Sequence, residues 1–348
     1  MSNRRILMYK RRRAHQREFK RLRMLALRFN PFENYDDSDF YIRYRFDKNT
    51  VRILVREFGD GLASHTSRSD ALTPETKILI TLRYLASNSL QQVISDCFGV
   101  NQSTACRAIW QVIPNIVAQM DKFIVFPSGR ELEETQSKFK NLTGIPGIIG
   151  ALDCTHVIVP VGKEREFAFV DRKGHTSLNI QAVCDFNYKF IHVYGKWPGS
   201  SHDSFILQQS KLFHDFESGR RNGILLGDSG YGNGKNWLLT PFMTTENQKE
   251  KHYNYNQKKA RVKIEQAFGQ LKRRFRGLLV GLRVSPERAI PTILAAFILH
   301  NIAKDRNQPD FDYESEESDY PICVEDMKKQ FTSREGKQFR DYIVRNYF

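Results

Sequence analysis

The feature that most constrains the fold is a succession of short apolar runs followed by two long striped segments in the second half of the chain. They predict strands at 148–159, 177–184 and 189–195, a helix at 203–214, a strand at 223–227, and helices at 256–279 and 286–304. In the first of the two long helices, apolar residues are spaced four, three, four and three apart, which indicates one buried helical face. This order of elements predicts an α/β domain with a mixed sheet.

The preceding region, residues 35–142, has a different texture and is predicted to be all helical. Residues 73–86 begin with Thr-Pro-Glu, a typical helix start. Within about 73–112, a short helix ending at Gly99 and a second helix after it have the layout of a helix-turn-helix. The side chains placed to reach base edges are Gln102, Ser103, Thr104 and Arg107. A plain packing pair of helices has the same pattern, so both interpretations stay open here.

The charge is large and uneven. The 348 residues carry a net charge of +15, yet residues 309–326 hold eight acids and no Lys or Arg, so the remainder carries +23. Residues 1–28 hold eleven Lys or Arg and one acid. A body this basic attracts polyanions, of which nucleic acid is the commonest. We expect a basic arm at 1–34, serving as a nuclear localisation signal or DNA contact, and an acidic tail at 307–348; solvated, disordered ends are the alternative.

The cysteines and the hydropathy pattern exclude several classes of protein. Five cysteines without a CxxC pair argue against a disulfide framework and a zinc ribbon, and for a reducing compartment. No apolar run is long enough for a membrane span, and no apolar stretch follows the basic start as in a signal peptide. The cytosol and the nucleus are the compartments that remain.

Three acidic residues are candidates for a functional role because of their positions in the predicted elements. Asp153 lies within the apolar run 148–159, where an unpaired charge is costly, and Asp228 directly follows the strand 223–227. If these strands are parallel neighbours, both acids emerge where α/β sheets place ligands. Glu265 lies beside the apolar stripe of its helix, with Arg261 four residues earlier on the same face. Taken singly, each has a bland alternative: a strand-end carboxylate, a turn-forming Asp, and a surface Glu paired with Arg261.

Together, these acids suit phosphodiester cleavage. That reaction needs charge stabilisation at a pentacoordinate phosphate and an activated nucleophile, which two Mg²⁺ ions roughly 3.5–4 Å apart supply. Mg²⁺ takes hard oxygen ligands and keeps several waters, so a few carboxylates suffice. Mn²⁺ is expected to substitute for it.

Several blocks of the sequence resemble the signatures of PIF/Harbinger DNA transposases and of nucleases derived from them. They are Leu152-Asp153-Cys154-Thr155-His156-Val157, Trp197-Pro198-Gly199-Ser200-Ser201-His202-Asp203, Gly227-Asp228-Ser229-Gly230-Tyr231, the run from Ile264 to Phe275, and Leu299-His300-Asn301. The resemblance covers about residues 70–304. It implies an RNase H-like nuclease domain at 143–306, with Asp153, Asp228 and Glu265 as the catalytic and metal-binding triad.

The resemblance leaves one assignment open, because the second acid is either Asp203 or Asp228. An RNase H-like order places the second acid after the fourth strand, which favours Asp228. We therefore expect His156, His202 and Asp203 near the site, orienting ligands or capping a helix. Basic side chains on the long helix are expected to hold the DNA backbone, namely Arg261, Lys272, Arg273 and Arg274.

The resemblance also implies a function and partners. It predicts a DDE-type transposase or endonuclease that cuts double-stranded DNA at terminal inverted repeats and transfers strands into A/T-rich targets. It further predicts a nuclear location, a Myb-like DNA-binding partner protein, and a homodimer or larger assembly. The alternative from another class is a domesticated DNA-binding adaptor or regulator without catalysis; the presence of all three acids favours the enzyme.

Overall fold

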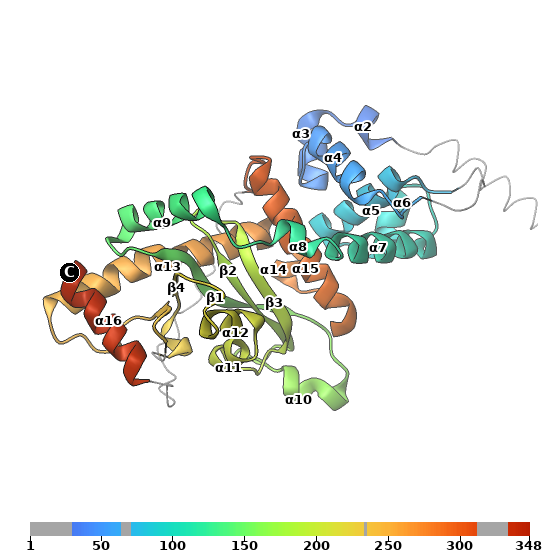
Figure 1. Cartoon of the computed structure of the whole chain (residues 1–348). Helices are drawn as coiled ribbons and strands as arrows, with labels where there is room; N and C mark the ends of the chain where they lie inside the picture. The colour runs from blue at the N-terminus through green and yellow to red at the C-terminus, as the bar shows by residue number, and fades with distance from the viewer. Residues whose placement is uncertain (1–29, 64–70, 233–234, 312–332) are drawn as a thin grey trace, which may run out of the picture. The chain divides into compact units, whose positions relative to one another are not determined.

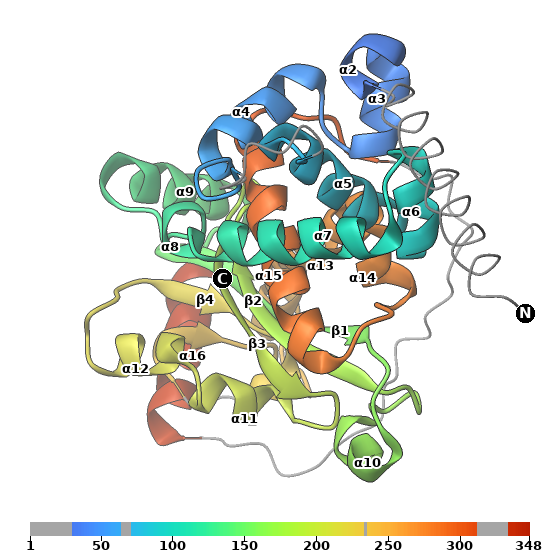
Figure 2. The same ribbon diagram turned by 90° about the vertical axis from the view of Figure 1, so that its right-hand side faces the viewer.

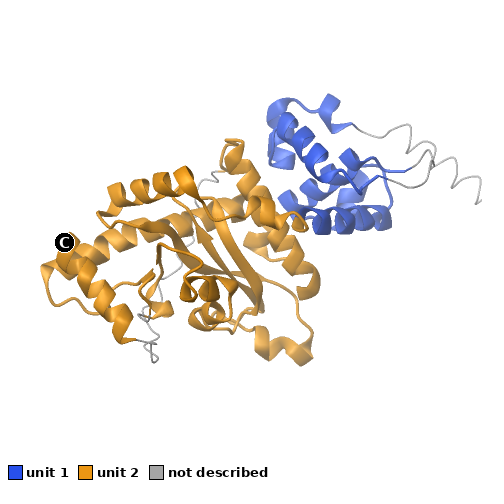
Figure 3. Ribbon diagram, in the orientation of Figure 1, with its two compact units in different colours: residues 1–116 blue, residues 117–348 orange. Residues whose placement is uncertain are grey.

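The computed structural model describes residues 30–63, 71–232, 235–311 and 333–348, and it divides into two compact units, residues 1–116 and residues 117–348 (Figures 1 and 3). The boundary therefore falls earlier than the expected position at 142–143. Helices α8 (Met120–Phe123) and α9 (Gly129–Thr143), which we expected in the helical region, belong to the second unit. Most of the basic arm expected at 1–34 lies outside the described residues.

The first unit is all helical in its described part, as expected. Its helices are α2 (Pro31–Asn34), α3 (Asp37–Tyr44), α4 (Lys48–Phe58), α5 (Pro74–Ser87), α6 (Gln91–Cys97) and α7 (Gln102–Val117). Side-chain caps begin four of them: Asn30, Asp36, Asp47 and Thr73 each accept a hydrogen bond from a backbone N–H in the first turn. Their apolar faces meet in a core around Phe40 and Ile80, which are fully buried.

The turn between α6 and α7 has the features predicted from the sequence. Gly99 adopts a φ of +59°, which a side chain would strain, and Val100 is 8% exposed. At the start of α7, Gln102, Ser103 and Arg107 are exposed and Thr104 is half-buried. These side chains are thus available at a helix start, and their contact with DNA stays a prediction.

The second unit is built on a five-stranded sheet in the order β3-β2-β1-β4-β5. The strands are β1 (Ile148–Ile158), β2 (Ser177–Cys184), β3 (Phe190–Pro198), β4 (Ile224–Leu226) and β5 (Leu238–Leu239). β2 is antiparallel to β1 and β3, while β4 is parallel to β1 and β5. The mixed α/β sheet confirms the predicted fold class, and this order and direction of strands are those expected of an RNase H-like domain. The two-residue β5 was not predicted.

Helices cover both faces of this sheet. In Figures 1 and 2, α11 (Asp203–Gln208) and α12 (Lys211–Glu217) lie on one face, and α13 (Gln248–Arg274) and α15 (Pro286–Asp305) lie on the other. Two predicted helices differ in detail. The helix expected at 203–214 is divided by Ser210, whose hydroxyl accepts from the backbone of Phe213 and caps α12. The long helix begins earlier than residue 256 and is followed by α14 (Arg276–Val280).

The region expected to be an acidic tail, residues 307–348, contains a helix. Helix α16 (Arg334–Tyr347) packs on α13 and β5, and its Arg340 is 8% exposed, lying over the Phe242 ring and donating to the Pro241 carbonyl. Residues 312–332, which include most of the acids, lie outside the described part. No helix in the described ranges has the length and apolarity needed to cross a membrane.

His300 and Asn301 of the Leu299-His300-Asn301 block clamp the start of β3 by hydrogen bonds to its backbone. The buried Asn301 side chain accepts from the Phe190 N–H at 2.8 Å and donates to the Phe190 and Phe123 carbonyls at 2.7 and 2.8 Å. His300 Nε2 pairs with the Tyr188 carbonyl at 2.9 Å, and burial lowers the pKa of His300 to about 3, so this ring is neutral and donates. The block therefore fixes the start of the edge strand to α15.

We expect Asn301→Ala to destabilise the second unit by about 3 kcal/mol, because it leaves three backbone groups, two of them buried, without this partner. Urea denaturation followed by circular dichroism measures this change. Asn346→Ala on the exposed side of α16 is the matched control. A loss below 1 kcal/mol relative to wild type, on the order of one ordinary hydrogen bond, would contradict the clamp.

Candidate metal centre

The parallel pairing of β1 and β4 brings the first two acids together. The last paired residues of these strands are Ala151 and Leu226. Asp153 and Asp228 each stand two residues beyond that pair, so both lie at the same level, just past the end of β4. β1 itself continues to Ile158, so Asp153 is at the middle of its strand and not at its end as the simplest expectation had it.

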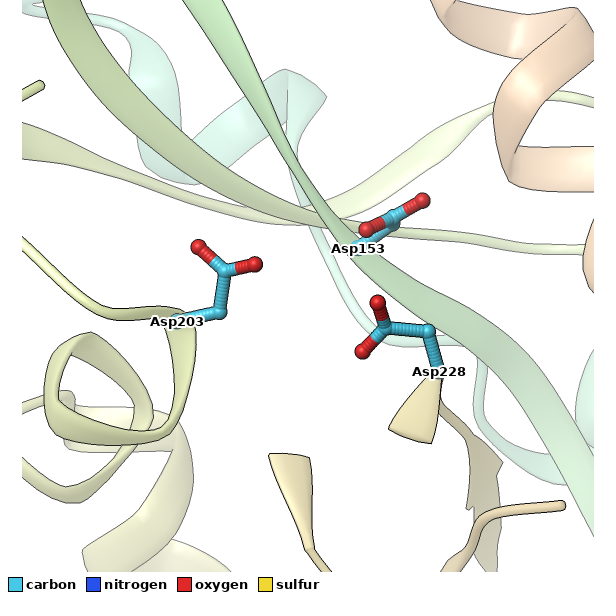
Figure 4. Close-up of side chains that lie close together, drawn as sticks. All are labelled: Asp153, Asp203 and Asp228. Carbon is cyan, nitrogen blue, oxygen red and sulfur yellow. The ribbon is translucent and has the colours of Figure 1, made fainter. Parts of the chain in front are cut away.

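A third carboxylate, Asp203, joins them at the start of α11. One oxygen from each of Asp153, Asp203 and Asp228 lies within 4.8 Å of the others, and their carboxyl groups converge from three separate elements (Figure 4). The Asp203 side chain is oriented by the buried Asn179 of β2, whose Nδ2 donates to Asp203 Oδ1 at 2.9 Å. We call these three residues the aspartate cluster.

Glu265 lies outside this cluster and is paired with a cation. Its carboxylate is 2.6 Å from Arg261 one helical turn earlier, and the other terminal nitrogen of Arg261 is 3.3 Å from Asp153. Glu265 is 47% exposed in its side chain, compared with 17% for Asp153. Arg261 thus links Asp153 and Glu265, two members of the predicted triad.

Burial and mutual repulsion give the cluster unusual proton affinities. Burial, and then the charge of Asp228, raises the pKa of Asp153 to about 8, although Arg261 opposes this. Burial also raises the pKa of Asp228, and the nearby Asp203 adds to the effect. A site that forces carboxylates to hold protons is a site where a bound cation would be strongly favoured.

The donor set fits a divalent hard cation. All three groups of the cluster offer carboxylate oxygens, which are the ligands that Mg²⁺ and Mn²⁺ prefer. The cluster has no imidazole ligand. Among the described residues, this is the group of three or more acidic, His or Cys side chains that could hold an ion.

The two histidines expected near the site have separate structural contacts. His156 Nδ1 is 3.0 Å from Ser177 Oγ, which donates to Asp171, and burial lowers the pKa of His156 while Asp203 and Asp171 oppose the change. His202 Nδ1 accepts from the Ser204 N–H and caps α11. His202 therefore positions the helix that carries Asp203.

The Trp197–Asp203 block contacts the segment between β1 and β2 and ends at Asp203 of the aspartate cluster. Gly199 packs so closely that a Cβ there would lie 2.2 Å from Ser177 Oγ and 2.7 Å from the Phe169 carbonyl. Ser200 Oγ donates to the Ala168 carbonyl at 2.6 Å, and the Ser201 carbonyl accepts from Asn179. Gly199, Ser200 and Ser201 thus fix the chain at the entry into α11, before Asp203.

The basic side chains predicted to hold DNA fall into different places. Lys272 donates to the His156 carbonyl at 2.9 Å; burial, and then Lys173, lowers its pKa to about 8. Arg261 and Lys272 therefore lie along β1 beside the cluster, and Arg273 is exposed. Arg274, which we expected to be available to DNA, is 1% exposed and donates to the Pro309 carbonyl, so it anchors the chain after α15.

Sequence reasoning missed two supports of the site. Asn179, a polar residue within the predicted strand 177–184, holds Asp203; a buried amide in an apolar run was the signal. The Tyr231 hydroxyl lies 3.2 Å from Sγ of Cys154, the residue that follows Asp153. Nothing in the spacing of these residues indicated that contact, which depends on the tertiary fold.

Comparison with known proteins agrees with this geometry. The family model described as DDE superfamily endonuclease matches residues 152–301, which include the aspartate cluster and Glu265. The protein "Putative nuclease HARBI1" from Bos taurus is 36% identical over 78% of this chain and 80% of its own length, and that from Homo sapiens is 35% identical over the same shares. This chain belongs to the Harbinger-type DDE endonuclease family.

The predicted resemblance is thereby confirmed, and the function class is that of a nuclease or transposase. Plant relatives share the domain more distantly: "Protein ALP1-like" from Arabidopsis thaliana is 30% identical over 71% of this chain and 64% of its own length. No solved structure matches the chain. Members of a DDE endonuclease family use divalent metal, and the aspartate cluster is where this chain offers ligands for it.

The raised pKa of Asp153 makes the metal-free fold sensitive to pH. Its carboxyl titrates near 3.8 when unfolded and near 8 when folded, so the folded state holds an extra proton between these values. The stabilisation is complete below about pH 4 and is lost as pH rises to 8. In EDTA, the fall in melting temperature between pH 5 and pH 8 should be smaller for Asp153→Asn than for wild type, by about 3 °C or more.

Differential scanning fluorimetry across that pH range measures the difference. Glu164→Gln, which alters an exposed carboxylate of the same unit, is the control and should follow wild type. If the melting temperatures of wild type and Asp153→Asn fall equally between pH 5 and pH 8, Asp153 is ionised in both the folded and the unfolded state over that range.

Proposed function

We propose that this protein is a Mg²⁺-dependent endonuclease that cuts double-stranded DNA and, in the transposase reaction, transfers the cut strand. The observation that carries the proposal is the convergence of Asp153, Asp203 and Asp228 within 4.8 Å, with Glu265 joined to Asp153 through Arg261. Family membership supports the same chemistry. Asp153, Asp228 and Glu265 remain our predicted catalytic triad, now with Asp203 beside it.

The carboxylates of the centre would hold the metal, and the side chains around them would keep them in place. When bound among these carboxylates, a pair of divalent ions stabilises the attacking and leaving oxygens of an in-line displacement. Asp153 and Asp228 are held at one level by the β1–β4 register, so their oxygens need little rearrangement. The buried Tyr231 contacts Cys154, the neighbour of Asp153 in β1, through its hydroxyl.

The basic side chains beside the cluster suit a phosphate backbone. Arg261 and Lys272 lie on the face of α13 that meets β1, with Arg273 exposed at the end of the same helix. Exposed Lys258 and Lys259 extend the charge toward the start of α13. Such contacts position DNA without reading its sequence. We assign sequence reading to Gln102, Ser103, Thr104 and Arg107 at the start of α7.

Partners and location follow from the family resemblance and are part of the proposal. They are terminal inverted repeats and an A/T-rich target as DNA, a Myb-like protein that assists DNA binding or nuclear entry, and a homodimer or larger assembly. The strongly basic chain is compatible with a nuclear, DNA-bound protein.

The proposal predicts that supercoiled plasmid, and DNA carrying candidate element ends, is nicked or cut in Mg²⁺ or Mn²⁺ and not in EDTA. Asp153→Asn, Asp228→Asn and Glu265→Gln should each reduce the rate by about 100-fold or more, because each removes a carboxylate that would hold the divalent ions that stabilise the transition state. Gel electrophoresis of the products over time gives the rates, with Glu164→Gln as the control.

A protein that binds this DNA, with the partner supplied, but leaves it intact in either metal would favour the adaptor alternative. Equal rates for wild type and the three variants would place the nuclease activity outside this centre or in a contaminant.

For the first unit, Arg107→Ala should weaken binding to element-end DNA by about 1–3 kcal/mol and leave binding to unrelated DNA almost unchanged, since a base-edge contact carries specificity. Fluorescence anisotropy at a fixed salt concentration measures both affinities. Arg56→Ala, an exposed arginine on α4 of the same unit, is the matched control. An equal loss on both DNAs would make Arg107 a phosphate contact.

A further inference from the structure

The imidazole ring of His156 has a hydrogen-bonding arrangement that the metal centre does not use. We propose that Nε2 of His156 accepts a hydrogen bond from the hydroxyl that attacks the phosphate. That hydroxyl belongs to water in the cutting step and to a 3′ end in strand transfer. The proposal rests on the proposed nuclease function and deepens it, because it gives the reaction a further residue that contacts a reacting atom.

The hydrogen bonds of Asp171 show that its carboxyl group is ionised. Its Oδ1 accepts from the backbone N–H groups of Lys173 and His175 at 2.9 and 3.0 Å, and its Oδ2 accepts from the buried Ser177 hydroxyl at 3.0 Å. Burial opposes the effect, but these hydrogen bonds lower the pKa of Asp171. An ionised carboxylate only accepts hydrogen bonds, so Ser177 must be the donor to Asp171.

Ser177 in turn fixes where the hydrogen of the His156 ring lies. A serine hydroxyl has one hydrogen, and here Asp171 receives it. The Ser177 oxygen can therefore only accept from His156 Nδ1, which is 3.0 Å away. Burial lowers the pKa of His156, while the charges of Asp203 and then Asp171 oppose the change. At neutral pH the ring is thus uncharged, with its hydrogen on Nδ1 and a lone pair on Nε2.

The ring lies at the edge of the aspartate cluster, on the side of Asp203. His156 and Asn179 are direct partners in the β1–β2 register, so their side chains share one face of the sheet, and Asn179 donates to Asp203. The charge of Asp203 acts on the ring more strongly than that of Asp171, whose Oδ2 is 4.0 Å from Nδ1. The His156 side chain is 41% exposed, so a bound substrate can reach it.

A lone pair on Nε2 restricts what the ring can contact in a nuclease site. Phosphate oxygens carry lone pairs themselves and offer nothing to accept. Mg²⁺ prefers carboxylate oxygen to imidazole, and His156 is outside the group of described side chains that could share an ion. The attacking hydroxyl, in contrast, has a hydrogen to donate. Giving that hydrogen to Nε2 turns a lone pair of its oxygen toward phosphorus.

The position of the ring is fixed before any DNA binds. Lys272 Nζ donates to the His156 carbonyl at 2.9 Å and holds this part of β1 to α13. Gly199 packs against the other end of the relay, where a Cβ would lie 2.2 Å from Ser177 Oγ. Ser177 therefore has little room to turn away from Nδ1. A ring held in this way needs little rearrangement to meet the nucleophile.

Two substitutions of His156 separate this role from a structural one. In His156→Asn, the amide can donate to Ser177 in place of Nδ1, but no atom replaces Nε2. The longer side chain of His156→Gln offers an acceptor near the position of Nε2. We expect His156→Asn to lower kcat for DNA cleavage by about 100-fold with KM within about twofold, and His156→Gln to keep about tenfold more activity than His156→Asn. A structural role alone predicts the opposite order.

The position of the hydrogen is measured without any reaction, by NMR of the full-length protein carrying ¹⁵N in its histidine rings, in EDTA at neutral pH. Correlations between ring hydrogens and ring nitrogens identify the tautomer, and the His156 signals are those missing from His156→Asn. We expect hydrogen on Nδ1 in wild type and loss of that preference in Ser177→Ala.

Controls exclude a change in folding or in metal binding. His156→Asn should melt within about 2 °C of wild type, because it keeps the hydrogen bond to Ser177. Its affinity for Mn²⁺, measured by isothermal titration calorimetry, should equal that of wild type. His214→Asn changes an exposed histidine on α12 and should match wild type in cleavage, melting and Mn²⁺ binding.

The inference is overturned if His156→Asn cuts DNA as fast as wild type, if the ring carries its hydrogen on Nε2, or if His156→Asn loses affinity for Mn²⁺, which would make the ring a metal ligand. Any of these results with an active wild type keeps the nuclease and refutes the role of His156. A wild-type protein that cuts no DNA refutes the proposed function, and the accepting role with it, whichever tautomer the ring adopts.

Discussion

The register between β1 and β4 is the constraint on which the rest of the second unit depends. Because the pairing ends at Ala151 and Leu226, Asp153 and Asp228 face each other across a gap that β4 no longer fills. Burial raises the pKa of both carboxyl groups, and the charge of a neighbouring carboxylate adds to it, Asp228 at Asp153 and Asp203 at Asp228. The surrounding elements must therefore supply enough packing to hold an arrangement that its own charges oppose.

That support comes from polar contacts that are distributed along the sheet and are made by the same blocks that identify the family. Gly199 and Ser200 fix the approach to α11, and Asn301 fixes β3 to α15 with three hydrogen bonds. Neither contact touches the aspartate cluster. A block shared with a family can thus owe most of its residues to the rigidity of the fold around the aspartate cluster, with one member, Asp203, in the cluster itself.

Sequence patterns predicted the parts of this architecture that repeat along the chain. The strands β1 to β4, the striped helix α13 and the meeting of Asp153 with Asp228 followed from the apolar runs, from an acid within one of them and from an acid directly after another. The family resemblance then selected one sheet order. What escaped prediction depends on contacts between segments that lie far apart: Asn179 with Asp203, Arg274 with Pro309, and α16 with β5. An Arg on a basic helix looks the same in sequence whether it is exposed or buried.

Arg261 shows which contacts of the predicted triad the sequence could indicate and which it could not. Its spacing of one helical turn from Glu265 predicts an ordinary ion pair, and the structure contains that pair. The contact with Asp153, however, requires α13 to cross β1 at this level. One guanidinium thus pairs with Asp153 and with Glu265 and also opposes the raised pKa of Asp228. Its single positive charge is shared between the aspartate cluster and Glu265, and no spacing along the sequence could indicate that.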